Sequence, residues 1–207
     1  MYFRPTSKKK FLGINTSDTE LRDISKAWFV ISLAFGIVLT RRSPLPIGYG
    51  FILAALTVGV GFVFHEMVHK LVAQRFGCFA EFRAFNHMLV LALLMSLFGF
   101  IFAAPGAVMI AGPVGRRRNG MISAAGIAAS LAIALLFLFV FLTAPFAFVK
   151  NIGLYGFVIN SWLALFNLIP LGNFDGVKVL HWNRIIYIVM VIMALMLMFL
   201  QGVLGGI

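Results

Sequence analysis

Two histidines and a glutamate lie close together in the segment FHEMVH, with a spacing that suits metal binding. His65 and His69 are four residues apart, so on a helix they lie on one face, one turn from each other. Two imidazoles placed in this way can bind one Zn²⁺ ion. Glu66 would reach the open side of the metal, where a carboxylate acts as general base on a water molecule. The segment therefore predicts a hydrolytic zinc site of the H-E-x-x-H type.

The composition of the chain makes a chance match improbable. With 4 histidines and 6 acidic residues in 207 positions, about 0.002 matches of this kind are expected. The segment also follows the apolar run GYGFILAALTVGVGFVF. Ionisable groups inside a membrane helix are costly and are usually functional. The alternative, two helix-face histidines paired with a buried glutamate for structural reasons, does not explain why three such groups stand there.

A catalytic zinc ion needs a third protein ligand and an open position. The chain offers four candidates for that ligand: Glu81, His87, Asp175 and His181. His181 precedes WNR, which is typical of a membrane-interface position. Asp175 lies in NLIPLGNFDG, where proline and glycines break an apolar helix. A helix broken at membrane depth exposes backbone polar groups, and a carboxylate that binds a metal there would give the break a function.

The composition is that of an integral membrane protein. The chain is 62% hydrophobic, has a mean hydropathy of +1.03 and contains only 11% charged residues, against about a quarter in soluble domains. The net charge of +11 comes from bases in short loops between apolar runs, which indicates membrane topology and not nucleic-acid binding. The one cysteine, Cys78, allows no internal disulfide.

The apolar runs predict an α-helical membrane protein with five or six transmembrane helices. The five expected spans run from about Leu21 to Leu39, Tyr49 to Phe76, Gly120 to Leu142, Ile152 to Leu168 and Ile185 to Leu204. A capping box is expected at Ser17 and Glu20, before the first span. The segment from His87 to Gly115 is long enough for a sixth span, but glycines and a proline interrupt it.

The basic residues favour five spans. If the segment from His87 to Gly115 enters the membrane and returns on the same side, 14 of the 17 basic residues lie on the side of the N-terminus. If it crosses, only 10 do. Cytoplasmic loops are enriched in Lys and Arg. We therefore expect a re-entrant segment, a multi-pass protein of the cell membrane and a cytoplasmic N-terminal segment at residues 1–20.

The two motifs together resemble the site-2 protease family of intramembrane zinc metalloproteases. Its second motif is N-x-x-P-x-x-x-x-D-G, which Asn167, Pro170, Asp175 and Gly176 match in register, and the resemblance covers about residues 48–180. It implies that one zinc ion is bound by His65, His69 and Asp175, with Glu66 as general base. It also implies that Asn167 holds the substrate backbone or the tetrahedral intermediate, and that a small membrane-embedded β segment follows the first motif.

One feature departs from the family pattern. Many members carry A-G-P-x-x-N at the start of the next span, whereas AAGIAAS has Ile127 and Ser130 at the positions of Pro and Asn. The departure concerns helix packing and not the metal ligands. The length leaves no room for an inserted PDZ domain or a nucleotide-binding regulatory domain, so any such regulation would come from a separate protein.

We therefore expect residues 1–207 to form a single transmembrane metalloprotease domain. Its substrate would be a membrane protein, cleaved within or near a transmembrane helix by zinc-activated water, after local unwinding and pairing with a strand of GFIFAAPGAVMI. The lipid bilayer is the other expected partner. The alternatives are a catalytically silent scaffold, a zinc carrier, or a membrane metalloprotease of another family that acts on soluble substrates. The last usually takes a later glutamate as third ligand, and no glutamate follows Glu81.

Overall fold

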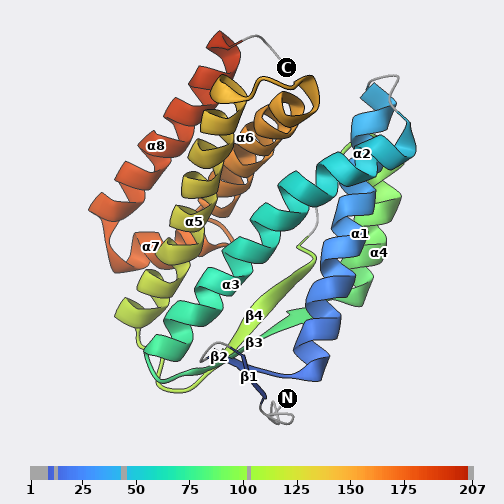
Figure 1. Cartoon of the computed structure of the whole chain (residues 1–207). Coiled ribbons are helices and arrows are strands. Elements are labelled where there is room, and N and C mark those ends of the chain that lie inside the picture. The colour runs from blue at the N-terminus through green and yellow to red at the C-terminus, as the bar shows by residue number, and fades with distance from the viewer. Residues whose placement is uncertain (1–8, 12–13, 43–45, 102–103, 205–207) are drawn as a thin grey trace. The chain divides into compact units, whose positions relative to one another are not determined.

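The computed structural model describes residues 9–11, 14–42, 46–101 and 104–204. The chain divides into two compact units, Met1–Val114 and Gly115–Ile207 (Figure 1). Four helices in the described residues are long and apolar enough to cross a membrane: Asp18–Arg41, Ile47–Arg75, Arg116–Thr143 and Arg184–Val203. The predicted helical membrane class is supported, while the number of spans and the prediction of a single domain stay predictions.

In its described residues, the first unit contains two long helical segments, one short helix and two small sheets. Its elements are β1 (Lys9–Phe11), β2 (Ile14–Thr16), α1 (Asp18–Arg42), α2 (Ile47–Ala54), the π-helix η1 (Ala55–Gly59), α3 (Val60–Arg75), β3 (Phe79–Ala84), α4 (Asn86–Ser96) and β4 (Gly106–Ala111).

Helix α1 begins with half of the expected capping box. The backbone N–H of Glu20 donates to Ser17 Oγ at 3.1 Å, which satisfies one of the unpaired amides at the helix start. The Glu20 side chain has other partners. It accepts instead from Thr16 Oγ1, 2.7 Å away, and from Lys70 on α3. The capping prediction is therefore confirmed for the serine, while the glutamate connects α1 to another helix.

Helices α2, η1 and α3 follow one another as a single helical run (Figure 1). It corresponds to the span predicted from Tyr49 to Phe76, with a π turn that the sequence did not reveal. Trp28 on α1 lies against this turn, and its Nε1 donates to the carbonyl of Ala55 at 3.3 Å. A Cβ at Gly59 would lie 2.5 Å from that nitrogen, so glycine is needed where the indole approaches the π turn.

Strands β3 and β4 form a two-stranded antiparallel sheet in which Phe79 pairs with Ala111 and Phe82 with Val108. The connection between them contains the 11-residue helix α4. In its described residues, the segment from His87 to Gly115 is therefore a short helix and a strand, not one long helix. The β structure expected after the first motif is present, although residues 102–103 of that stretch lie outside the described residues.

The second unit consists of helices α5 (Arg116–Thr143), α6 (Ala147–Asn167), α7 (Asp175–Trp182) and α8 (Arg184–Val203). Its core contains Ile127, Phe157 and Val179, all fully buried. Helices α5 and α6 approach closely at Gly156, where an added Cβ would lie 2.3 Å from the ring of Phe137. Helix α6 matches the span predicted from Ile152, although it is not one of the four membrane candidates.

Candidate metal centre

His65 and His69 lie one turn apart on α3, and their side chains converge. The two Nε2 atoms are 3.0 Å apart, and the rings are nearly perpendicular, with centroids at 4.5 Å. Two nitrogens that each lie 2.0–2.1 Å from one zinc ion must be within about 4.2 Å of each other, so this separation suits a shared ion. Both residues are buried, with 3% and 7% exposure. The predicted pairing of the histidines on one helix face is confirmed.

Glu66 occupies the next position on α3 and contacts the small sheet. Its Oε2 accepts a hydrogen bond from the backbone N–H of Val108 on β4, at 3.2 Å. The side chain is only partly buried. The predicted general base is therefore next to the histidine pair in sequence and is held at the edge of a strand.

That hydrogen bond identifies which edge of β4 faces Glu66. Val108 is paired with Phe82 across the sheet, and the Phe82 N–H donates to a side chain and not to β4. Phe82 and Val108 are thus a non-hydrogen-bonded pair, whose backbone groups point away from each other. The outer edge of β4, opposite β3, is consequently the edge that meets the Glu66 carboxylate.

Asp175 is the first residue of α7 in the second unit, and it is buried with 7% exposure. Its Oδ1 accepts from Ser123 Oγ at 2.9 Å and from Lys178 Nζ at 3.0 Å. The helix break before it is tightly packed, because a Cβ at Gly176 would lie 2.3 Å from the carbonyl oxygen of Leu168. The glycine of the second motif is thus needed for the start of α7 to lie this close to Leu168, and this close approach fixes where Asp175 lies in the second unit.

Asn167 is the last residue of α6, just before the break. Its Nδ2 donates to the carbonyl of Leu163 one turn earlier, at 2.9 Å. The side-chain amide is therefore folded back on its own helix. A role in holding substrate would require it to rotate away from that carbonyl, and this role stays a prediction.

The other three candidates for the third ligand have different surroundings. Glu81 is buried in the first unit, where it accepts from Ser17 Oγ and pairs with Arg83 at 2.8 Å. His87 is exposed and its ring stacks on Phe85. His181 is exposed on α7, and its backbone carbonyl accepts from Arg116. None of the three combines burial with the helix-break position that Asp175 has.

Sequence reasoning missed the groups that hold these side chains in place. Ser123 and Lys178 contact Asp175, and the backbone of Val108 contacts Glu66. A signal existed for Lys178, which stands three residues after Asp175 and so shares its helix face. The position of Ser123, 52 residues away, had no local signal.

Comparison with known proteins gives one curated relative. The chain is 42% identical over 140 residues to a protein of Methanocaldococcus jannaschii named "Putative zinc metalloprotease", and the match covers 66% of this chain and 73% of that protein. No protein-family model matches the chain, and no solved structure does. Identity at this level over most of both sequences reflects common descent, and the chain belongs to the same zinc metalloprotease family as that archaeal protein.

Proposed function

We propose that the protein is an intramembrane zinc endopeptidase of the site-2 protease type, which hydrolyses peptide bonds within or near transmembrane helices of other membrane proteins. One observation carries the proposal. The converging pair His65 and His69, with Glu66 beside it, stands on a helical run that is long and apolar enough to cross a membrane. A hydrolytic metal site in such a helix has little use except on a substrate that is itself in the membrane.

The proposed ligands of one zinc ion are His65, His69 and Asp175. By donor type and burial these three residues could hold a metal ion. Two imidazole nitrogens and one carboxylate oxygen form a three-ligand set that zinc accepts in catalytic sites, and it leaves the fourth position for water or substrate. When bound, the zinc ion would supply a Lewis acid and lower the pKa of a water molecule.

Glu66 is the proposed general base. It would take a proton from the attacking water and return it to the leaving amine. Its hydrogen bond to Val108 N–H keeps the carboxylate at the strand edge. Asn167 is the proposed additional donor to the oxyanion.

The outer edge of β4 is the proposed binding place for the substrate backbone. A peptide bond in a helix is already hydrogen-bonded, so the substrate must unwind before hydrolysis. An unwound segment could pair with the edge of a strand by β-augmentation, since the backbone groups at that edge supply matching donors and acceptors. The contact between Val108 and Glu66 places this edge beside the proposed base.

In the membrane we propose five spans and a cytoplasmic N-terminus, with α4 and β4 in a re-entrant segment. The pairing of β4 with β3 supports the re-entrant placement, because it returns the chain at Ala111 to the strand that follows α3. Non-helical backbone is tolerated at membrane depth where protein covers it. The positive-inside rule supports the cytoplasmic N-terminus.

The alternative functions are a catalytically silent scaffold and a zinc carrier. A scaffold has no use for Glu66, and a structural zinc site is usually closed by four protein ligands. A carrier would need ionisable residues along several membrane helices. The candidate span Arg116–Thr143 has basic residues only at its first three positions, and Arg184–Val203 only at its first. Both features favour the peptidase.

A reconstituted cleavage assay tests the proposal. The purified protein in liposomes, offered a single-span test protein, should cleave it, lose activity after zinc removal with a chelator and regain activity when zinc is added back. Elemental analysis should find about one zinc ion per chain. A protein that binds zinc but cleaves none of several single-span proteins would support the scaffold or carrier.

A further inference from the structure

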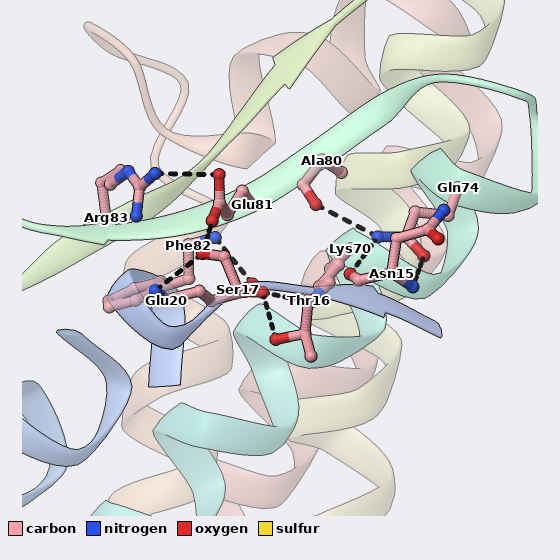
Figure 2. Close-up of polar contacts among 10 residues, drawn as sticks. All are labelled: Asn15, Thr16, Ser17, Glu20, Lys70, Gln74, Ala80, Glu81, Phe82 and Arg83. Carbon is pink, nitrogen blue, oxygen red and sulfur yellow. Dashed lines mark hydrogen bonds and ion pairs between the residues drawn. The ribbon is translucent and has the colours of Figure 1, made fainter. Parts of the chain in front are cut away.

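A buried ion pair stands directly beside the histidine pair and has no part in the proposed chemistry. Lys70 follows His69 on α3, and its Nζ contacts the carboxylate of Glu20 on α1 (Figure 2). The two side chains are 3% and 0% exposed. Burying two charges costs more than their attraction readily repays, so such a pair is a candidate for a specific positional function.

Glu20 also binds the sheet. Its Oε1 accepts from the backbone N–H of Phe82 on β3 at 2.9 Å (Figure 2). Two residues further along the strand, Ala84 N–H donates to the carboxylate of Asp23 on α1 at 3.2 Å. The edge of β3 that faces away from β4 is therefore held by carboxylates of α1.

A third contact at the same edge comes from α3. Gln74 Nε2 donates to the carbonyl of Ala80 at 3.2 Å and to the carbonyl of Asn15 at 2.9 Å (Figure 2). Its Oε1 accepts from Asn15 N–H at 3.0 Å. Alternate residues of β3, namely Ala80, Phe82 and Ala84, are thus each bound through the backbone by a side chain of α1 or α3.

These contacts fix β3 at one position along α3. Because β4 is paired with β3 in a defined register, they also fix where Val108 lies along α3, and Val108 is the residue that meets Glu66. A slip of one residue along a strand is a displacement of about 3.3 Å. That distance separates one peptide bond of an extended substrate from the next.

We infer that Glu20 and Lys70 are positioning residues that set the register of the β4 edge against Glu66, and through it select which peptide bond of the substrate is hydrolysed. The choice of the hydrolysed bond rests on the proposed function. The position of the β4 edge along α3 concerns the first unit alone. Breaking the pair should loosen the position of the sheet along α3 and spread hydrolysis over neighbouring bonds.

Two variants test the inference. Lys70→Met removes the charge while keeping an unbranched side chain, and Glu20→Gln keeps an acceptor for Phe82 N–H while removing the ionic partner. Arg75→Met is the matched control, because Arg75 is exposed on the last turn of the same helix.

The first readout is mass spectrometry of the products from one single-span protein, with the amounts normalised to zinc-loaded enzyme. An unfolded fraction lowers the yield but adds no new cleavage position.

The second readout does not depend on activity. Spin labels at Ile52 on α2 and Met109 on β4, both exposed, would be introduced in a Cys78→Ala background. Ile52 lies about 21 Å along the helix from Glu66, so the interspin distance falls within the range of pulsed electron paramagnetic resonance. The parent and Arg75→Met should give one narrow distance distribution, and Lys70→Met a broader or displaced one.

The expected result is one dominant cleaved bond for the parent and for Arg75→Met, and two or more adjacent bonds for Lys70→Met and Glu20→Gln. A single unchanged bond, or an unchanged distance distribution, in both variants would overturn the inference. A parent that cleaves nothing would count against the proposed function alone, and the distance distribution would still decide whether the pair positions the sheet. If Lys70→Met does not fold, the milder Glu20→Gln carries the same comparison.

Discussion

Replacing Glu66 by Gln separates an enzyme from a zinc-binding scaffold. Glutamine has almost the same shape but cannot accept the proton from the attacking water. Loss of a general base typically lowers the rate about 10²- to 10⁴-fold, which corresponds to about 2.7 to 5.4 kcal/mol of transition-state stabilisation. The zinc ligands proposed at His65 and His69 keep their helical spacing, so zinc content should be unchanged.

The cost of the same substitution to folding should be much smaller. The amide oxygen of glutamine can still accept from Val108 N–H, which lies 3.2 Å from Oε2 in the parent. Changing a charged acceptor to a neutral one weakens a hydrogen bond by about 1 kcal/mol. Removal of a charge from a partly buried position offsets part of that loss. The free energy of unfolding should therefore change by less than about 1 kcal/mol.

The assay compares parent, Glu66→Gln and Glu66→Asp at equal zinc content, with cleavage of a single-span protein in liposomes and thermal unfolding measured on the same samples. Glu66→Asp keeps a carboxylate but draws it back by one methylene, so its rate should lie between the other two. Cleavage by Glu66→Gln at the parental rate with zinc in place would show that Glu66 is not the base. Loss of zinc from that variant would mean that the carboxylate supports the metal instead.

Three further outcomes are expected. Asp175→Ala should retain less zinc by elemental analysis, because a three-ligand set loses its carboxylate, and unchanged zinc content would exclude Asp175 as a ligand. Cysteines at Asn119 and at Asp18 in a cysteine-free background should react with an impermeant reagent from the same side of the membrane, and labelling from opposite sides would require a sixth span. Gly156→Leu should lower the free energy of unfolding by about 1–3 kcal/mol through overpacking, measured by thermal unfolding. Gly202→Leu is its control, because in the described part of the chain no atom outside the backbone of its own helix turn lies within 4 Å of an added Cβ there, and an equal loss in both would contradict the packing argument.

Local patterns in the sequence were sufficient for most elements. The apolar runs located α1, α5, α6 and α8 to within a few residues, since length and hydropathy depend on neighbouring positions alone. The helical spacing of His65 and His69 correctly predicted that their rings meet. The resemblance to site-2 proteases correctly anticipated β structure in the segment that became β4.

Contacts between distant residues could not be read in this way. Ser17 and Glu20 have capping-box spacing, yet the Glu20 side chain binds Lys70, 50 residues away. Which of two local partners a carboxylate prefers depends on what the rest of the chain brings within reach. Lys70 was itself a signal, because a lysine beside a metal motif in an apolar helix needs a partner, but a single sequence does not name that partner.

The π turn at Ala55–Gly59 has a consequence for how the helix can change. An α-helix advances about 100° per residue, and a π turn accommodates one residue more than an α turn. The π turn therefore absorbs one extra residue, and everything after η1 is rotated by about 100° relative to the direction it would have in a continuous α-helix of the same sequence. Before the π turn, Gly50 faces α1, since an added Cβ there would lie 2.8 Å from the carbonyl oxygen of Gly36. After the π turn, His65 and His69 are among the buried residues. Tightening η1 into a regular α turn with no change of sequence would leave the H-E-x-x-H spacing intact and still turn both imidazoles about a quarter of a revolution away from their present direction.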